Sequence, residues 1–134
     1  MNKVFLGGTC NETTWRDDLI AVLDVDYFNP VVEDWSHECQ AREEKEKAAD
    51  CNIHLYVITS EMMGTYSIAE AIESAMTRGK QTILHVIPDG FSVAQVISLE
   101  AVTRMVRKHG GISYIDSDLH RTARVLNNSY KNRS

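Results

Sequence analysis

Short apolar runs that alternate with amphipathic segments constrain the fold of this chain more than any other feature. Five such runs occur, at residues 4–6, 27–28, 53–58, 82–87 and 112–115, and a segment with apolar residues at helical spacing follows each of them. This alternation is typical of a parallel sheet whose strands are joined by helices. The third run is apolar at nearly every position, as expected for a central strand that is covered on both faces.

The segments between the runs carry helix boundary signals. Ser92 and Gln95 form a capping-box pattern at the start of the fourth helical segment, which ends at Gly110-Gly111. The helix after the third run is expected to end at Gly79, and Ser117 is a candidate cap for the last helix. The remaining expectations are a second helix over residues 36–49, a frayed polar tail over residues 127–134, and an inner face of the first helix formed by Trp15, Leu19, Ile20, Val22 and Leu23.

The length and the number of units predict the fold. A chain of 134 residues with 43% hydrophobic and 25% charged residues is expected to form one α/β domain over residues 1–134. Five right-handed βα units favour a flavodoxin-like doubly wound parallel sheet with strand order 2-1-3-4-5. In that order the loops after the first and third strands face one crevice, where open α/β sheets bind ligands. The candidate binding residues in these loops are Gly7, Gly8, Thr9, Gly64, Thr65 and Ser67.

Glu70 is the candidate that carries chemistry. It lies in the first turns of a helix that directly follows the third apolar run, near backbone N–H groups that favour an anion. A glutamate in this place can act as a nucleophile or bind sugar hydroxyls. The alternative is a charge that only stabilises the helix start, by about 0.3–1 kcal/mol.

Three further positions have a structural interpretation beside the functional one. Gly7-Gly8 either makes a tight turn from strand to helix or lets a ligand approach the backbone. Asn29, at the carboxyl end of the second strand, is either a turn residue or an amide that reaches a ligand. Asp50 is expected to bind local backbone N–H groups rather than to act in catalysis.

Charged residues near the crevice are expected at the surface. Arg16 is expected to be solvated, with a structural or ligand pairing as the alternative. Glu43 and Lys47, four residues apart, are expected on a charged outer face of the second helix. The alternative is that one glutamate of the run 43–46 points inward.

Composition excludes several classes of function. The net charge of −5 argues against nucleic acid polymers, whose binding depends on clustered Lys and Arg. Three cysteines without C-x-x-C spacing and five scattered histidines predict neither a disulfide framework nor a metal site, and no histidine is spaced to pair with Cys10. No cofactor is expected, because the dinucleotide and Walker patterns are missing. The cysteine pattern indicates a reducing compartment, so we expect a cytoplasmic protein. We also expect a soluble protein that is not exported, because no apolar run approaches a membrane span and the N-terminal apolar segment is too short for a signal peptide.

Five landmarks occur in an order that resembles the nucleoside 2-deoxyribosyltransferase-like family. They are residues 4–9 (VFLGGT) with Trp15-Arg16, residues 28–30 (FNP), Gln40 and Glu43 ahead of Ala49-Asp50, residues 64–70 (GTYSIAE), and Gly79-Lys80. The resemblance covers roughly residues 3–90. The chain differs from the family pattern at Ile72, where the family has a glycine, and at residues 62–64, where an acid is missing.

The resemblance implies a flavodoxin-like fold and cleavage of the N-glycosidic bond of deoxynucleosides or deoxynucleoside monophosphates, by transfer or by hydrolysis. It implies that Glu70 is the nucleophile, that Asp50 or Glu43 supports the acid or base step, and that the first glycine loop borders the sugar pocket. Thr65 and Ser67 are then candidates for binding a sugar hydroxyl or a 5′-phosphate at the helix N-terminus. Family members complete their pockets with a neighbouring subunit, so the resemblance also implies a homo-oligomer.

Two alternatives come from other classes of protein. A non-catalytic nucleotide-binding or signalling module would keep the fold and the pocket without turnover. A response-regulator-like receiver needs acids after the first and third strands, whereas Gly7-Gly8 and Thr59-Ser60 stand there. We therefore set the receiver aside.

Overall fold

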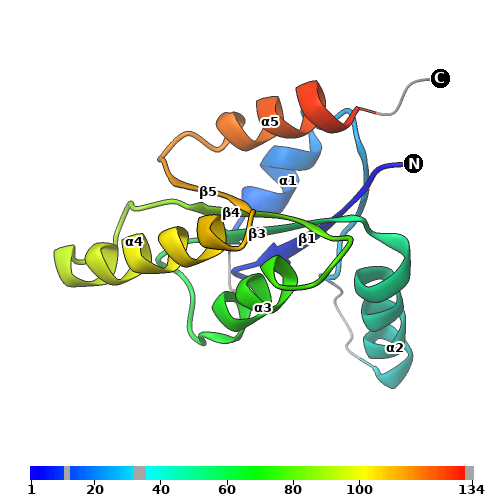
Figure 1. Ribbon diagram of the computed structural model, residues 1–134, viewed down its shortest axis with the longest axis horizontal. Coiled ribbons are helices and arrows are strands. Elements are labelled where there is room, and N and C mark those ends of the chain that lie inside the picture. Colours follow the sequence, from blue (N-terminus) through cyan, green and yellow to red (C-terminus); the bar gives the residue numbers. More distant parts are fainter. Residues whose placement is uncertain (11–12, 32–35, 132–134) are drawn as a thin grey trace.

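The computed structural model describes residues 1–10, 13–31 and 36–131 and contains a five-stranded, all-parallel sheet. The strand order β2-β1-β3-β4-β5 confirms the predicted order 2-1-3-4-5 (Figure 1). The strands are β1 (Lys3–Gly8), β2 (Asp26–Phe28), β3 (Ile53–Ile58), β4 (Gln81–Val86) and β5 (Ile112–Ile115).

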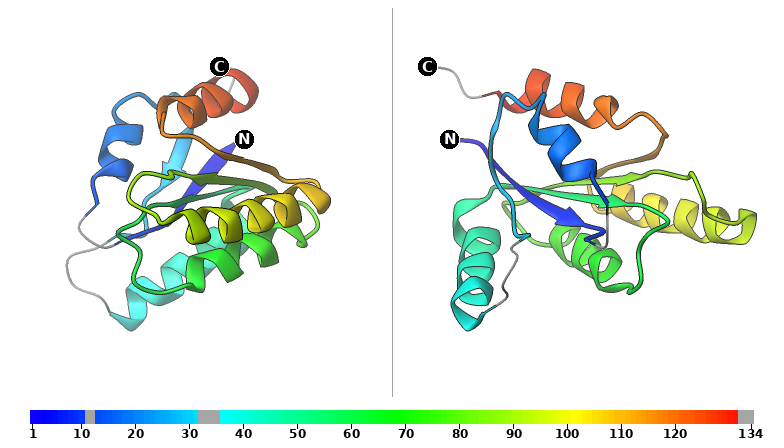
Figure 2. Two further views of the ribbon diagram at one scale, coloured as in Figure 1. Left: turned by 90° about the vertical axis from the view of Figure 1, so that its left-hand side faces the viewer. Right: turned by 180° about the vertical axis from the view of Figure 1, so that it is seen from behind.

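Helices cover both faces of the sheet. On one face lie α1 (Trp15–Ile20) and α5 (His120–Tyr130), and on the other α3 (Tyr66–Ala75) and α4 (Val93–Lys108) (Figures 1 and 2). α2 (His37–Lys45) lies on the same side as α3, and its last turn continues as the π-helix η1 (Glu46–Asp50). No helix in these described parts of the chain combines the length and the apolar character needed to cross a membrane.

Two apolar clusters hold the layers together. One joins α1 and α5 to the sheet around Leu19 and Leu126, and the other joins α3 and α4 to the sheet around Tyr56, Ala71 and Leu99. All five side chains are buried. The predicted arrangement of strands covered on both faces is therefore the one that burial of apolar surface stabilises.

β1 ends in two glycines whose small size the neighbouring strand requires. Gly8 lies opposite Val57 in the parallel ladder and has a φ of +114°, which residues with side chains rarely adopt. A Cβ on Gly8 would lie 2.1 Å from the carbonyl oxygen of Val57. A Cβ on Gly7 would lie 2.7 Å from the ring of Tyr56. Both glycines therefore have a structural role at the end of the strand itself, rather than only in a turn after it, and both also line a cavity.

α1 and α3 are shorter than predicted. α1 ends at Ile20, and Val22 lies in the following turn with 40% of its surface exposed. The prediction that Val22 lies on the inner face is wrong, because the apolar period continues in the sequence after the helix has stopped. α3 ends at Ala75, and Gly79, with a φ of +86°, belongs to the turn before β4.

α5 begins without the predicted Ser117 cap. The hydroxyl of Ser117 donates to the carboxylate of Asp89. The Asp118 carboxylate accepts the backbone N–H of His120 at 2.9 Å, so the acid next to Ser117 serves the helix start.

α5 also extends beyond its predicted end. It continues to Tyr130, so the predicted frayed tail does not begin at Asn127. The amide of Asn127 accepts the N–H of Asp24 at 2.7 Å and donates to the carbonyl of Val22 at 2.8 Å, which ties this turn of the helix to the loop before β2. Residues 132–134 of the predicted tail lie outside the described residues.

Candidate active site

A cavity of about 330 Å³ opens over β1, between α2 and α3. Phe5 and Gly7 line it from β1, since alternate residues of a strand share a face. Gly8, the last residue of β1, also lines it. The rest of its lining comes from the loops after β1 and β2 and from α1, α2 and α3: Cys10, Arg16, Pro30, Val31, Glu43, Tyr66, Ser67 and Glu70. We call it the glutamate cavity. Its volume lies at the lower end of the range for small-molecule sites.

Glu70 forms an ion pair with Lys47 at the wall of the glutamate cavity. The Nζ atom of Lys47 lies 2.8 Å from Oε2 of Glu70, and the two side chains are only 22% and 13% exposed. Burial on its own would lower the pKa of Lys47, but the hydrogen bond and the charge of Glu70 outweigh it and raise this pKa above its ordinary value. Lys47 therefore remains a cation directed at Glu70, and its predicted position on an outer face is wrong.

Glu43 lines the same cavity from α2. Burial raises the pKa of Glu43, the negative charge of Glu70 raises it further, and Lys47 opposes both effects in part. The predicted outer-face position is thus wrong for Glu43 as well, and it is a glutamate of the run 43–46 that points inward. Two carboxyl groups in unequal environments are a common arrangement for acid–base chemistry.

The π-helix η1 sets the position of Lys47. The N–H of Cys51 donates to the carbonyl of Glu46 at 2.7 Å, five residues back, which is the hydrogen bond of a π-helix. The ammonium of Lys80 donates to the carbonyls of Ala48 and Cys51 at 2.8 and 2.9 Å. Single π-turns inside α-helices are frequent at functional sites.

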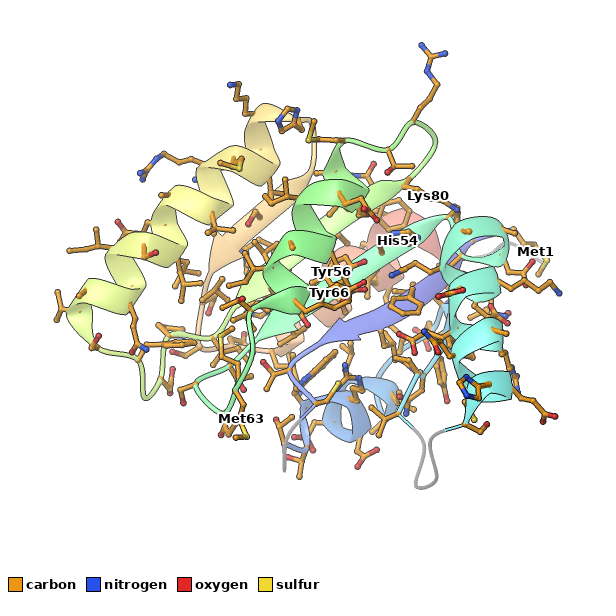
Figure 3. All side chains as sticks on the ribbon, turned by 90° about the horizontal axis from the view of Figure 1, so that it is seen from below. Met1, His54, Tyr56, Met63, Tyr66 and Lys80 are labelled. Carbon is orange, nitrogen blue, oxygen red and sulfur yellow. The ribbon has the colours of Figure 1, made fainter. Side chains whose placement is uncertain are left out.

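A buried hydrogen-bond chain runs beneath η1 from His54. The Nε2–H of His54 donates to the carbonyl of Lys47 at 2.7 Å, because a carbonyl can only accept. Nδ1 therefore accepts the hydroxyl of Ser74 at 2.8 Å, and Ser74 accepts the hydroxyl of Thr82 at 2.7 Å. His54 and Lys80 (Figure 3) both line a separate cavity of about 210 Å³ between η1 and α3, which Lys47 and Glu70 also line. These hydrogen bonds connect η1 to β3, α3 and β4.

His54 makes the stability of the fold sensitive to acid. Burial lowers the pKa of His54 from 6.5 to about 4. Between these pH values the unfolded chain binds a proton at His54 and the folded protein does not. The free energy of unfolding is therefore expected to fall as the pH drops from 6.5 to 4, by roughly 3 kcal/mol from this residue. Urea unfolding followed by circular dichroism at several pH values measures the change. His54→Gln should show a smaller decrease than the parent across this range, and an equal decrease would contradict the assignment.

Arg16 is buried, which corrects the prediction that it is solvated. Only 5% of its surface is exposed, and burial lowers the pKa of its guanidinium. The guanidinium donates, at 2.9, 3.2 and 2.7 Å, to the carbonyl oxygens of Leu6, Gly8 and Thr9. Arg16 thereby fixes the loop that borders the glutamate cavity, and it lines the cavity itself.

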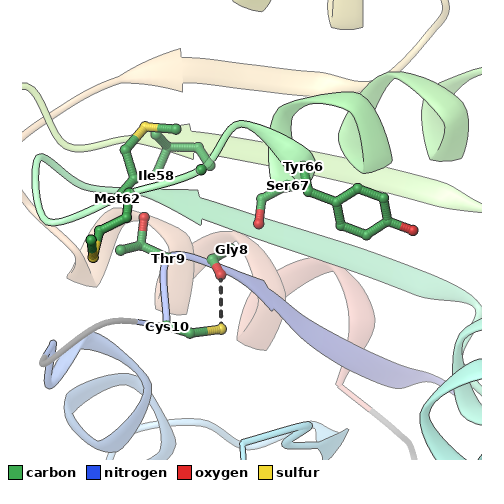
Figure 4. A pocket seen from close by; sticks show the side chains of 9 residues that line it. Gly8, Thr9, Cys10, Ile58, Met62, Tyr66 and Ser67 are labelled. Atoms are coloured by element: carbon green, nitrogen blue, oxygen red, sulfur yellow. Dashed lines mark hydrogen bonds between the residues drawn. The ribbon is translucent and has the colours of Figure 1, made fainter. Parts of the chain in front are cut away.

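A smaller cavity, of about 140 Å³, adjoins the glutamate cavity and lies between the loops that follow β1 and β3 (Figure 4). We call it the loop cavity. The two cavities share Gly8, Cys10, Tyr66 and Ser67, and the loop cavity adds Thr9, Ile58, Met62, Met63 and Gly64. Of the predicted binding residues, Gly7, Gly8, Thr9, Gly64 and Ser67 therefore line one cavity or the other.

Three predicted site residues lie away from these two cavities. Asp50 is exposed at the end of η1, with its carboxylate 3.7 Å from Lys45. The side chain of Asn29 accepts the N–H of Val31 at 3.1 Å, as in a turn, and lines a neighbouring cavity. Thr65 is the exposed N-cap residue of α3, and within the described residues its side chain caps no N–H group.

The two departures from the family pattern have structural counterparts. Ile72 is half-buried and packs against the apolar cluster of α3 and α4, where a glycine would leave space. Met62 and Met63 line the loop cavity in the segment where the acid is missing. This end of the site consequently offers thioether groups instead of a carboxylate.

Sequence reasoning missed the roles of Lys47 and Arg16. A Glu43–Lys47 spacing of four residues is typical of a solvated helix pair, and a π-helix leaves no signature in spacing. For Arg16, the available signal was the glycine loop just before it, whose carbonyl groups need donors once they are buried.

A doubly wound α/β domain with a half-buried glutamate over its first strand defines a class of protein that binds small ligands at a topological switch point. Within that class, the chain belongs to the nucleoside 2-deoxyribosyltransferase like family, whose model matches residues 1–91. No curated protein matches the chain. The matched segment contains Glu43, Lys47 and Glu70.

Proposed function

We propose that the protein cleaves the N-glycosidic bond of a deoxynucleoside or deoxynucleoside monophosphate, with Glu70 as the nucleophile and Glu43 as the proton donor. The observation that carries the proposal is that both carboxyl groups line one cavity while Lys47 pairs with Glu70 at 2.8 Å. Membership of the family supports the substrate class. Asp50 has no part in this scheme, because it is exposed and lies near Lys45.

The first step forms a glycosyl ester. An oxygen of Glu70 attacks C1′ of the sugar, the bond from C1′ to the base nitrogen breaks, and its electron pair goes to the base. The departing base takes the proton of Glu43. The raised pKa of Glu43 favours the protonated form that this step needs.

The second step releases the sugar. The carboxylate of Glu43 removes a proton from the incoming nucleophile, which attacks C1′. The ester C–O bond then breaks and its electron pair returns to Glu70. Water as the nucleophile makes the protein a hydrolase, and a second base makes it a transferase. The 5′ end of the sugar would point to the loop cavity, which Gly64 and Ser67 line at the start of α3.

Incubation with each deoxynucleoside and deoxynucleoside monophosphate, with and without an acceptor base, tests the proposal. Free base that appears without an acceptor indicates a hydrolase, and base that appears only with an acceptor indicates a transferase. If no substrate turns over and a nucleotide nevertheless raises the melting temperature, the non-catalytic nucleotide-binding module is the better assignment.

Glutamine in place of Glu43 is expected to lower kcat/KM by about 100-fold, the usual contribution of a general acid. In the parent, kcat/KM should fall as the pH rises through the raised pKa of Glu43, because the proton is then lost. In Glu43→Gln this alkaline decrease should be missing. Glu44→Gln, an exposed neighbour on the same helix, is the matched control and should keep the parent profile. A parent-like profile in Glu43→Gln would assign the proton donor elsewhere.

A further inference from the structure

We propose that Lys47 is a positioning residue for Glu70: its ammonium holds the carboxylate in place beside the second acid, Glu43. This inference rests on the proposed function, and it gives a role to a residue that lies outside the landmarks of the family resemblance. Lys47 makes no step of the reaction itself, and it acts through Glu70.

The contact has the geometry of a specific pair. The ammonium donates to one oxygen of Glu70, Oε2, at 2.8 Å, so the carboxylate has a second oxygen with which to attack a sugar carbon. The Nζ atom also lies 5.9 Å from the centre of the Phe5 ring, so the ammonium lies over a residue of β1 that lines the cavity. Such a partly buried pair is screened less by salt than a surface pair.

The backbone that carries Lys47 is held from two directions. His54 donates to the carbonyl of Lys47 itself at 2.7 Å. Lys80 donates to the carbonyls of Ala48 and Cys51 at the end of the same turn. Because these hydrogen bonds already fix the backbone, forming the ion pair has to order only the side chain of Lys47 and not the turn that carries it. The ammonium is therefore preorganised against Glu70.

The charges around Lys47 explain why a cation is needed. Glu43 from α2 and Glu70 and Tyr66 from α3 act on it electrostatically. Two carboxylates that share a cavity repel each other, and this disfavours the state in which both are ionised. A cation bound to Glu70 offsets part of this repulsion.

Three lysine variants test the role in turnover. Lys47→Met, which keeps the length of the side chain but not its charge, should lower kcat by about 100-fold and change KM by less than about threefold, because the nucleophile is misplaced while the pocket remains. Lys47→Arg should keep at least about a tenth of the parent kcat. Lys45→Met, on the same helix and with a 74% exposed side chain, is the matched control and should keep the parent kcat. A Lys47→Met protein with a kcat near that of the parent, or equal losses in Lys47→Met and Lys47→Arg, would overturn the proposal.

A second readout does not depend on turnover. The titration of Lys47 can be followed through its Cε shift by NMR, and the signal is assigned by its loss in Lys47→Arg. In Glu70→Gln the pKa of Lys47 should fall below its ordinary value, because burial then acts without its main opposing partner. An unchanged pKa would mean that the pair does not exist in solution and would overturn the inference. A shifted pKa in a protein that turns over no substrate would instead refute the proposed function and leave the pair standing.

Discussion

Glutamine in place of Glu70 is expected to lower the rate of base release by at least about a thousandfold. The amide has nearly the shape of the carboxylate, but it has no negative charge with which to stabilise the developing positive charge at C1′, and it forms no ester. Free base measured by chromatography under single-turnover conditions gives the rate.

The control for this variant lies on the same helix. Glu73 is exposed and three residues further along α3, so Glu73→Gln should keep the parent rate. Because Glu70→Gln removes the partner of Lys47, its melting temperature must be measured beside its activity. A folded Glu70→Gln protein that retains a tenth or more of the parent rate would contradict the role of nucleophile.

Alanine in place of Gly8 is expected to reduce the free energy of unfolding by about 4 kcal/mol, which is at the upper end of the losses that single substitutions cause. Two effects add at this position. The φ of +114° is strained for a residue with a side chain, and the new Cβ would lie 2.1 Å from a backbone oxygen of Val57, in the centre of the sheet. Backbone inside a sheet has little freedom to move, so β1 and β3 would have to separate. Urea unfolding followed by circular dichroism measures the loss.

Gly79→Ala separates the two effects. Gly79 also has a positive φ, +86°, but an added Cβ would meet nothing within 4 Å among the described residues. It is therefore expected to cost only about 1–2 kcal/mol, from backbone strain alone. Equal losses in Gly8→Ala and Gly79→Ala would show that the approach of Val57 does not matter.

The fold could be predicted from the sequence because its signals are local and consistent. The apolar runs coincide with the strands, and at β3 the predicted range 53–58 equals the observed Ile53–Ile58. The capping box of Ser92 and Gln95 forms as predicted at the start of α4. Handedness and connection rules then leave few topologies open for five such units, and the observed order is one of them.

The ends of helices could not be predicted as well, because distant contacts decide them. The amide of Asn127 in α5 binds the backbone of residues 22 and 24, more than a hundred positions away, so a polar segment that looks frayed in the sequence is ordered. The prediction for Val22 is wrong because the helical spacing of apolar residues continues in the sequence although the helix has already ended at Ile20.

The candidate site was only partly accessible to sequence reasoning. Topology rules place the loops after β1 and β3 together, and Gly8 at the end of β1 and Ser67 at the start of α3, which flank these loops, do line both cavities. The orientation of charged side chains was not accessible. Whether Lys47 points to solvent or to Glu70 depends on the π-helix and on its anchors His54 and Lys80, which are side-chain contacts across the fold.

Covalent trapping of the sugar tests the central claim most directly. Fluorine at C2′ of a deoxynucleoside destabilises positive charge at C1′ and slows both steps. With a readily departing base and no acceptor base, the first step remains the faster one, so the glycosyl ester should accumulate. Mass spectrometry of the digested protein should then find the fluorosugar on the peptide that contains Glu70, and Glu70→Gln should give no adduct. Base release by the parent with Glu70 unmodified, or with the sugar on another cavity residue such as Cys10, would contradict the account.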